Sequence, residues 1–237
     1  MNKNITSFKE YTKEYKKSIE DPEMFWEEKA KNFVWKKSWD NVLSWDFTKP
    51  EIKWFDGGKL NITENCLDRH LEKKGDKTAI RWIANNPKEK NINLSYKELH
   101  KKVCQFSNVL RKNGVKKGDR ICLYMPMVPE LAIAVLACAR IGAIHSVVFA
   151  GFSAKSLSER INDANCKLLI TADGGFRGDK ITPLKEISDE AMKSTPSIKK
   201  CIVLKRTKSN INMQNNRDLW WHNEMEEASS NCKVEIM

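Results

Sequence analysis

The fold of this chain is decided by one stretch, DRICLYMPMVPELAIAVLACARIGAIHSVVFAGFS, residues 119–153. It opens with a short apolar run that ends at Pro126, and the segment after Pro129 is apolar nearly all round. A second apolar run then covers residues 144–149. A helix without a polar face is buried, so we interpret the stretch as a strand, a buried helix and a second strand. This alternation favours right-handed crossovers and a parallel sheet.

The alternation continues toward the C-terminus. Ser153 is the predicted N-cap of an amphipathic helix, and KLLITAD supplies a third strand. A fourth helix is expected over residues 180–193, beginning near Asp179, and KKCIVLKRT supplies a fourth strand. We therefore predict an α/β fold in which helices flank a parallel sheet. Its strands are expected near 119–125, 144–149, 167–172 and 200–205.

The N-terminal half contains clear helix signals. Ser95 and Glu98 form a capping-box pattern before a helix that Gly114 ends, and residues 77–96 are predicted to hold two short strands. Residues 7–47 look helical and rich in aromatics. We expect these aromatics to dock the arm onto a larger body by packing, with an aromatic box for a ligand as the alternative. They are Trp26, Phe33, Trp35, Trp39 and Trp45.

The composition describes a globular chain with a strong positive charge. Its 237 residues are 41% hydrophobic, and 42 Lys and Arg against 31 Asp and Glu leave a net charge of +11. A positive balance favours anionic partners such as nucleotides, coenzymes, nucleic acid or a membrane surface. The lysines are dispersed, with no run of five like charges, so solvated side chains are the plainer interpretation. We expect no specific nucleic-acid partner.

Cysteine usage indicates a cytoplasmic protein. None of the seven cysteines form a C-x-x-C pair, and Cys104, Cys122, Cys138 and Cys166 lie in apolar stretches, as small core residues of a reducing compartment do. The N-terminus is polar, and the most apolar helix is too short to span a bilayer. We therefore expect no membrane partner.

Several familiar site patterns are missing from the sequence. It contains no G-x-x-x-x-G-K-[ST], no G-x-G-x-x-G and no G-x-S-x-G. The four histidines, among them His145, show no metal spacing, and His145 is expected in the core because it lies mid-strand. Trp220, Trp221 and His222 suggest stacking on a base, but burial at the edge of the sheet is the simpler prediction.

The best candidate site lies where the predicted strands end. YMPMVPE, FAGFS and ADGGFRGDK all leave strand ends on one edge of the sheet, which is where parallel sheets bind ligands. Arg177 and Lys180 would place two cations there, beside a predicted helix N-terminus that offers free N–H groups to an anion. Phe149 and Gly151 would provide a wall for a flat base. The alternative is that the glycines serve the turn and the cations are solvated.

Four motifs in this order carry a resemblance to a known family. GGKLNITENCLDRH, YMPMVPELAIAVLACARIGAIHSVVFAGFSAKSLSERI, ITADGGFRGDK and RDLWWH resemble the AMP-forming acetyl-CoA synthetases of the adenylate-forming superfamily, from about residue 8 onward. The resemblance implies a helical N-terminal arm over residues 1–60. It implies that residues 61–237 form the first part of the large AMP-binding α/β domain.

The resemblance also implies a reaction and its substrates. Members couple acetate, ATP and coenzyme A through acetyl-adenylate, releasing pyrophosphate and then AMP, with magnesium neutralising phosphate charge. In the family, the basic residues of the glycine-rich turn bind the 3′-phosphate end of CoA, and the F-x-G-F-S segment lies against its adenine. The positions here are Phe149, Ala150, Gly151, Arg177, Gly178, Asp179 and Lys180. Asp179 stands where the family usually has glycine.

The resemblance covers only part of the family chain. The glycine-rich ATP loop, the acetate pocket and the lid with its catalytic lysine have no counterpart in residues 1–237. We therefore expect an N-terminal fragment of an acetate–CoA ligase that holds part of the CoA nucleotide site, has no catalytic residue and is inactive alone. A propionyl-CoA synthetase fragment, a non-catalytic CoA- or nucleotide-binding module and a basic nucleic-acid-binding protein stay open as alternatives.

Overall fold

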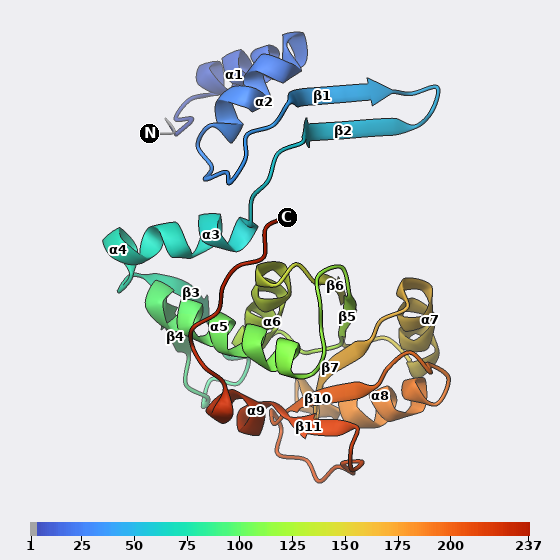
Figure 1. Cartoon of the computed structure of the whole chain (residues 1–237). Coiled ribbons are helices and arrows are strands. Elements are labelled where there is room, and N and C mark those ends of the chain that lie inside the picture. Colours follow the sequence, from blue (N-terminus) through green and yellow to red (C-terminus); the bar gives the residue numbers. More distant parts are fainter. Residues whose placement is uncertain (1–3) are drawn as a thin grey trace. The chain divides into compact units, whose positions relative to one another are not determined.

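A computed structural model describes residues 4–237 of the chain (Figure 1). The chain divides into two compact units. The first holds the residues up to Leu60 together with Ile236 and Met237, and the second holds Asn61–Glu235. Each unit is built from its own elements.

The first unit begins with two helices, α1 (Phe8–Glu20) and α2 (Pro22–Ala30). The Asp21 carboxylate caps α2 by accepting a hydrogen bond from the Met24 N–H, and Pro22 occupies the first helical position. The helical prediction over 7–47 is wrong for its last part. Two antiparallel strands follow α2 instead, β1 (Asn41–Asp46) and β2 (Glu51–Asp56). Their cross-strand pairing overrides the local helical pattern.

Aromatic side chains of this unit pack on one another. The Trp35 ring lies 5.0 Å from that of Trp39 and 5.6 Å from that of Phe55, centroid to centroid. Trp26 meets Trp54 edge-on at 6.3 Å. These ring contacts join α2 and the loop after it to the hairpin strand β2.

The second unit is built on a five-stranded parallel sheet (Figure 1). Its order is β11-β10-β7-β5-β6 and every pairing is parallel. The four predicted strands are confirmed, with slightly shorter bounds, and a fifth edge strand was not predicted. The bounds are β5 Arg120–Leu123, β6 Ile144–Val147, β7 Leu168–Ala172, β10 Lys200–Leu204 and β11 Asp218–Trp220.

Helices connect the strands and divide into two groups. In the first group, α6 (Pro129–Arg140) packs on α5 (Tyr96–Lys112), and α5 also contacts α9 (Trp221–Glu227). In the second group, α7 (Ala154–Ala164) packs on α8 (Leu184–Met192). The chain steps from β5 to β6 in one direction and from β6 to β7 in the other. Right-handed crossovers therefore place α6 and α7 on opposite faces of the sheet. The capping box of Ser95 and Glu98 and the Ser153 cap are both confirmed.

Small elements complete the second unit. They are α3 (Ile62–Cys66), the 3₁₀ turn η1 (Asp68–His70), α4 (Leu71–Lys74), the antiparallel pair β3 (Thr78–Trp82) and β4 (Ile92–Ser95), and the hairpin β8 (Gly175–Arg177) and β9 (Lys180–Thr182). The hairpin corrects the prediction for the fourth helix. α8 begins at Leu184 rather than near Asp179, because Gly178, with φ of +58°, turns the chain back on itself.

The core follows the apolar strands. β7 is buried along its whole length, and Cys104, Cys122, Cys138 and Cys166 are buried free thiols as predicted. The core placement of His145 is wrong, because the side chain is exposed on β6. β6 is the last strand at one edge of the sheet, so its neighbours leave it partly uncovered.

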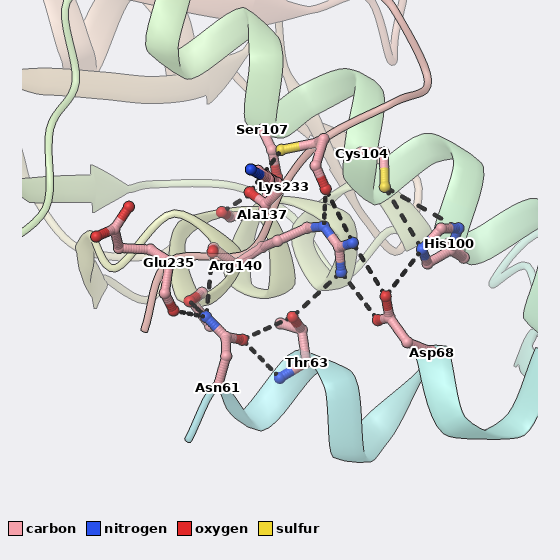
Figure 2. A network of polar contacts seen from close by, with 12 residues as sticks. Asn61, Thr63, Asp68, His100, Cys104, Ser107, Ala137, Arg140, Lys233 and Glu235 are labelled. Carbon is pink, nitrogen blue, oxygen red and sulfur yellow. Dashed lines mark hydrogen bonds and ion pairs between the residues drawn. The ribbon is translucent and has the colours of Figure 1, made fainter. Parts of the chain in front are cut away.

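Arg140 ties several segments of the second unit together (Figure 2). Its guanidinium donates to both oxygens of the Asp68 carboxylate, at 2.9 and 3.0 Å, and to the backbone carbonyl of Cys232 at 3.0 Å. His100 on α5 lies 3.3 Å from the same carboxylate. The backbone carbonyl of Arg140 accepts from the Asn61 side chain and from the Glu235 N–H. One buried arginine thus joins the end of α6 to α5, the 61–68 segment and the 232–235 segment.

Candidate functional site

The sheet topology predicts where a ligand would bind. Counted along the chain, the strand order is 2-1-3-4-5, and the order reverses between β5 and β7. Sheets of this order bind ligands outside the carboxyl ends of the strands at that reversal. A cavity of about 810 Å³ lies there. Its lining comes from the carboxyl ends of β3, β5, β6 and β10, from the β8–β9 hairpin that follows β7, and from the start of α6 and α8. The residues are 82–85, 125–128, 147–151, 175–177, Leu131, Thr182, Leu184 and Arg206.

One wall of the cavity is the segment Phe149–Gly151. The Tyr124 hydroxyl fixes the end of this segment by donating to the carbonyl of the next residue, Phe152, at 2.7 Å, and it lies 3.4 Å from the carbonyl of Ala150. Burial raises the pKa of Tyr124 to about 12, so the hydroxyl keeps the proton that it donates. The Phe149 ring is 65% exposed, and a Cβ on Gly151 would lie 2.4 Å from it. A side chain at position 151 would displace the ring, so glycine leaves an open, flat apolar surface.

The β8–β9 hairpin contributes one predicted cation directly. Arg177 lines the cavity, and its strand partner Lys180 lies opposite it in register. Gly178 and Asp179 form the turn between them and lie outside the cavity lining, as does Lys180. The structure therefore brings Phe149, Ala150, Gly151 and Arg177 together at one cavity. No helix begins at this turn, so the helix dipole that was expected to support an anion is absent from it.

Arg206 is a cavity residue that the sequence analysis missed. Its guanidinium carbon lies 4.8 Å from the Phe176 ring centroid and 5.4 Å from that of Trp82, and Nη2 donates to the Glu89 carboxylate at 2.8 Å. The sequence did contain a signal for Arg206, because this residue follows the fourth predicted strand. Ligands bind outside the carboxyl ends of parallel strands, and this holds for the fourth strand as well as for the first three.

A buried carboxylate positions the segment that carries Arg206. Asp173, 1% exposed at the end of β7, accepts hydrogen bonds at Oδ1 from the backbone N–H groups of Gly174, Arg206 and Thr207. These distances are 2.7–2.9 Å. Its Oδ2 atom is buried and has no hydrogen-bond partner among the described residues. Asp173 thus fixes the end of β10 against the end of β7.

The arrangement can bind a ligand that has both a flat apolar part and anionic groups. Aromatic and aliphatic side chains form most of the lining, and two guanidinium groups, those of Arg177 and Arg206, stand at it. Arginine is suited to phosphate because its planar donors match two oxygens at once. Within residues 4–237, no three His, Cys, Asp or Glu side chains converge as a metal site would require. No helix of the described chain is long and apolar enough to cross a membrane.

Comparison with known proteins finds clear relatives. Residues 67–233 match the AMP-binding enzyme family and residues 11–66 match the acetyl-coenzyme A synthetase N-terminus. The chain is 51% identical over 228 residues to an acetyl-coenzyme A synthetase of Bdellovibrio bacteriovorus, covering 96% of this chain and 35% of that protein. It is 48% identical over 229 residues to acetyl-coenzyme A synthetase 2 of Pseudomonas aeruginosa, with the same two coverages. The chain therefore spans about a third of the length of these relatives.

A solved structure shares the fold. The acetoacetyl-CoA synthetase from Streptomyces lividans superimposes with a TM-score of 0.84 at 24% identity, over 94% of this chain and 33% of that one. The α/β fold with its parallel sheet is thus the fold of the corresponding part of that synthetase.

Proposed function

The chain belongs to the AMP-binding enzyme family, and because its residues 11–66 match the acetyl-coenzyme A synthetase N-terminus, we propose that it is part of an acetate–CoA ligase. The whole ligase joins acetate, ATP and CoA. Acetate attacks the α-phosphate of ATP to give acetyl-adenylate and pyrophosphate, and the CoA thiol then displaces AMP to give acetyl-CoA. In this proposal, residues 1–237 supply the nucleotide end of the CoA site.

The cavity at the carboxyl edge of the sheet carries the proposal. The flat surface of Phe149, Ala150 and Gly151 suits the adenine ring, and Arg177 suits the 3′-phosphate of CoA. Lys180 lies outside the cavity lining but in register with Arg177 on the neighbouring strand, and in this proposal its ammonium adds to the positive charge around the same anion. Gly178 serves the turn, and Asp179 is exposed at its tip, where water screens its charge.

The remaining chemistry lies outside the described site. Magnesium would enter with ATP and neutralise its phosphate charge, and the residues described here offer it no converging ligands. Propionate in place of acetate is the alternative acyl group, since none of the cavity residues is assigned to the acyl chain. We further infer a cytoplasmic location, which the seven free thiols support.

Calorimetric titration tests the CoA site. CoA and 3′-dephospho-CoA are titrated into the wild-type chain, Arg177→Ala and a control, Lys193→Ala, which removes an exposed positive charge at the end of α8. We expect wild type and control to prefer CoA. A charge-assisted hydrogen bond is worth about 1.5–3 kcal/mol, so Arg177→Ala should bind CoA about ten- to a hundredfold more weakly and lose the preference. Equal binding of both ligands by the wild type would contradict the proposal.

The same cavity allows a second candidate, a CoA- or nucleotide-binding module without catalysis of its own. Titration alone does not separate the two, because both bind CoA. Sequence beyond residue 237 does, since the ligase requires an ATP phosphate loop and a lid lysine in the same protein. Specific binding of nucleic acid is not part of either proposal.

A further inference from the structure

We propose that Arg206 forms a second anion subsite at the cavity wall, which binds the diphosphate of a nucleotide ligand in competition with Glu89, the carboxylate that pairs with the Arg206 guanidinium. The inference rests on the proposed CoA site and adds to it a residue and a ligand group. It is carried by the contacts that hold the Arg206 guanidinium at the cavity wall.

Contacts hold Arg206 both at its backbone and at its guanidinium group. Its backbone N–H donates to Asp173 Oδ1 at 2.7 Å, and the rings of Trp82 and Phe176 hold the guanidinium at centroid distances of 5.4 and 4.8 Å. The Trp82 ring is itself fixed, because its Nε1 donates to the Met127 carbonyl at 2.8 Å. An arginine held in this way loses little side-chain entropy when it binds an anion.

The guanidinium retains capacity for a ligand. The side chain of Arg206 is only 18% exposed. Of its guanidinium nitrogens, only Nη2 donates a hydrogen bond to a described residue, and the acceptor is the carboxylate of Glu89. The other N–H donors of a guanidinium form a fork that fits two oxygens of a phosphate. A partly buried cation with unused donors at a cavity wall is what an anion subsite requires.

Glu89 acts as an internal substitute for the ligand anion. It lies in the segment between β3 and β4, 117 residues from Arg206 in sequence, with its side chain 31% exposed. A bound phosphate and the Glu89 carboxylate would repel each other, so the ligand must displace Glu89 or overcome its charge. Weakly charged ligands therefore bind less well, which makes the pair a selectivity device.

The diphosphate is the group that fits best. Arg177 is assigned to the 3′-phosphate, and Arg206 stands at the same cavity on the segment after a different strand, so the two arginines suit two separate anionic groups of one ligand. CoA carries a 3′-phosphate and a diphosphate, while 3′-dephospho-CoA keeps only the diphosphate. The two ligands therefore report on the two arginines separately.

The test combines these two ligands with four variants of the full 237-residue chain. Arg206→Met should weaken CoA and 3′-dephospho-CoA by the same factor, about ten- to a hundredfold, whereas Arg177→Ala should weaken CoA alone. Glu89→Gln should tighten both ligands, and Lys193→Ala should change neither. The circular dichroism spectrum and the melting temperature of each variant check that it is folded.

The outcomes separate this inference from the CoA site itself. Binding that depends on Arg177 but is unchanged in Arg206→Met and Glu89→Gln would overturn the Arg206 subsite and leave the CoA site standing. Failure of the wild type to bind either ligand would overturn both. If Arg206→Met does not fold, Glu89→Gln decides alone, because tighter binding supports the subsite and unchanged or weaker binding contradicts it.

Discussion

Arg177 and Lys180 lie directly opposite each other across the β8–β9 hairpin, with only Gly178 and Asp179 between them. Residues opposite each other in an antiparallel pair point to the same face, with Cβ atoms about 4.5–5.5 Å apart. Two cations at that spacing repel each other and destabilise the hairpin. A shared anion would relieve this repulsion, which supports the CoA site proposed at Arg177.

Replacing one cation of this pair should separate stability from binding. We expect Lys180→Thr to stabilise the chain by up to about 1 kcal/mol, since it removes a like-charge pair and adds a residue that favours strands. The same variant should bind CoA more weakly. Urea unfolding and calorimetry measure the two effects. A variant that is less stable and binds CoA as well as wild type would show that Lys180 serves the hairpin rather than a ligand.

The buried Arg140–Asp68 pair should be important for stability. Arg140→Met leaves the Asp68 carboxylate paired only with His100 and leaves the buried carbonyl of Cys232 without its guanidinium donor, so we expect a loss of about 1–3 kcal/mol in unfolding free energy. Chemical denaturation measures it. The exposed Arg160 on α7 provides the control, and Arg160→Met should change stability by about 0.5 kcal/mol or less.

A double variant sharpens this prediction. Asp68→Leu combined with Arg140→Met removes the carboxylate together with its arginine and should recover part of the loss, because His100, without the hydrogen bond to Asp68 that raises its pKa, can lose its proton and leave no charge unpaired. A double variant less stable than Arg140→Met alone would contradict this account of the network.

His100 should make the stability of the chain depend on pH. Hydrogen bonds to Asp68 and Cys104 raise its pKa to about 9. The pKa is higher in the folded state, so the contribution to stability is complete below about pH 6.5 and is lost as the pH rises through about 9. The stability difference between wild type and His100→Gln should therefore shrink from pH 6 to pH 10. A difference that is constant over this range would contradict the raised pKa.

The 237-residue chain should not form acetyl-adenylate by itself. Its sequence contains no glycine-rich ATP phosphate loop, and none of its residues is assigned to catalysis. Acetate-dependent exchange of labelled pyrophosphate into ATP measures the step directly, with a full-length relative as positive control. Exchange above the level without enzyme would contradict the prediction.

Local sequence was sufficient to predict most helices and strands of the second unit. The capping box at Ser95 and Glu98 and the cap at Ser153 are recognisable because a cap involves residues only three positions apart. The central strands β5, β7 and β10 are recognisable because they are apolar on both faces. The ends of the predicted strands are also enough to predict that Phe149 and Arg177 lie on one edge of the sheet.

The misplaced elements depend on partners that are distant in the chain or on one backbone angle. The strand at 41–46 requires its pairing with 51–56, and the late start of α8 follows from the tight turn at Gly178. His145 is exposed because β6 lies at the edge of the sheet. The order of strands in a sheet is set by how the whole set of helices packs, and no local pattern records it.

By itself, the sequence determined the alternation of strands and helices, the four buried thiols and the edge of the sheet at which the cavity lies, because each follows from neighbouring residues. Only the tertiary structure decided that Arg206 meets Glu89 and that Arg140 meets Asp68, pairs separated by 117 and 72 residues. The reason is physical. A charge can lie in a partly buried site only where the completed fold supplies its counterion, and which carboxylate arrives there is a property of the packing.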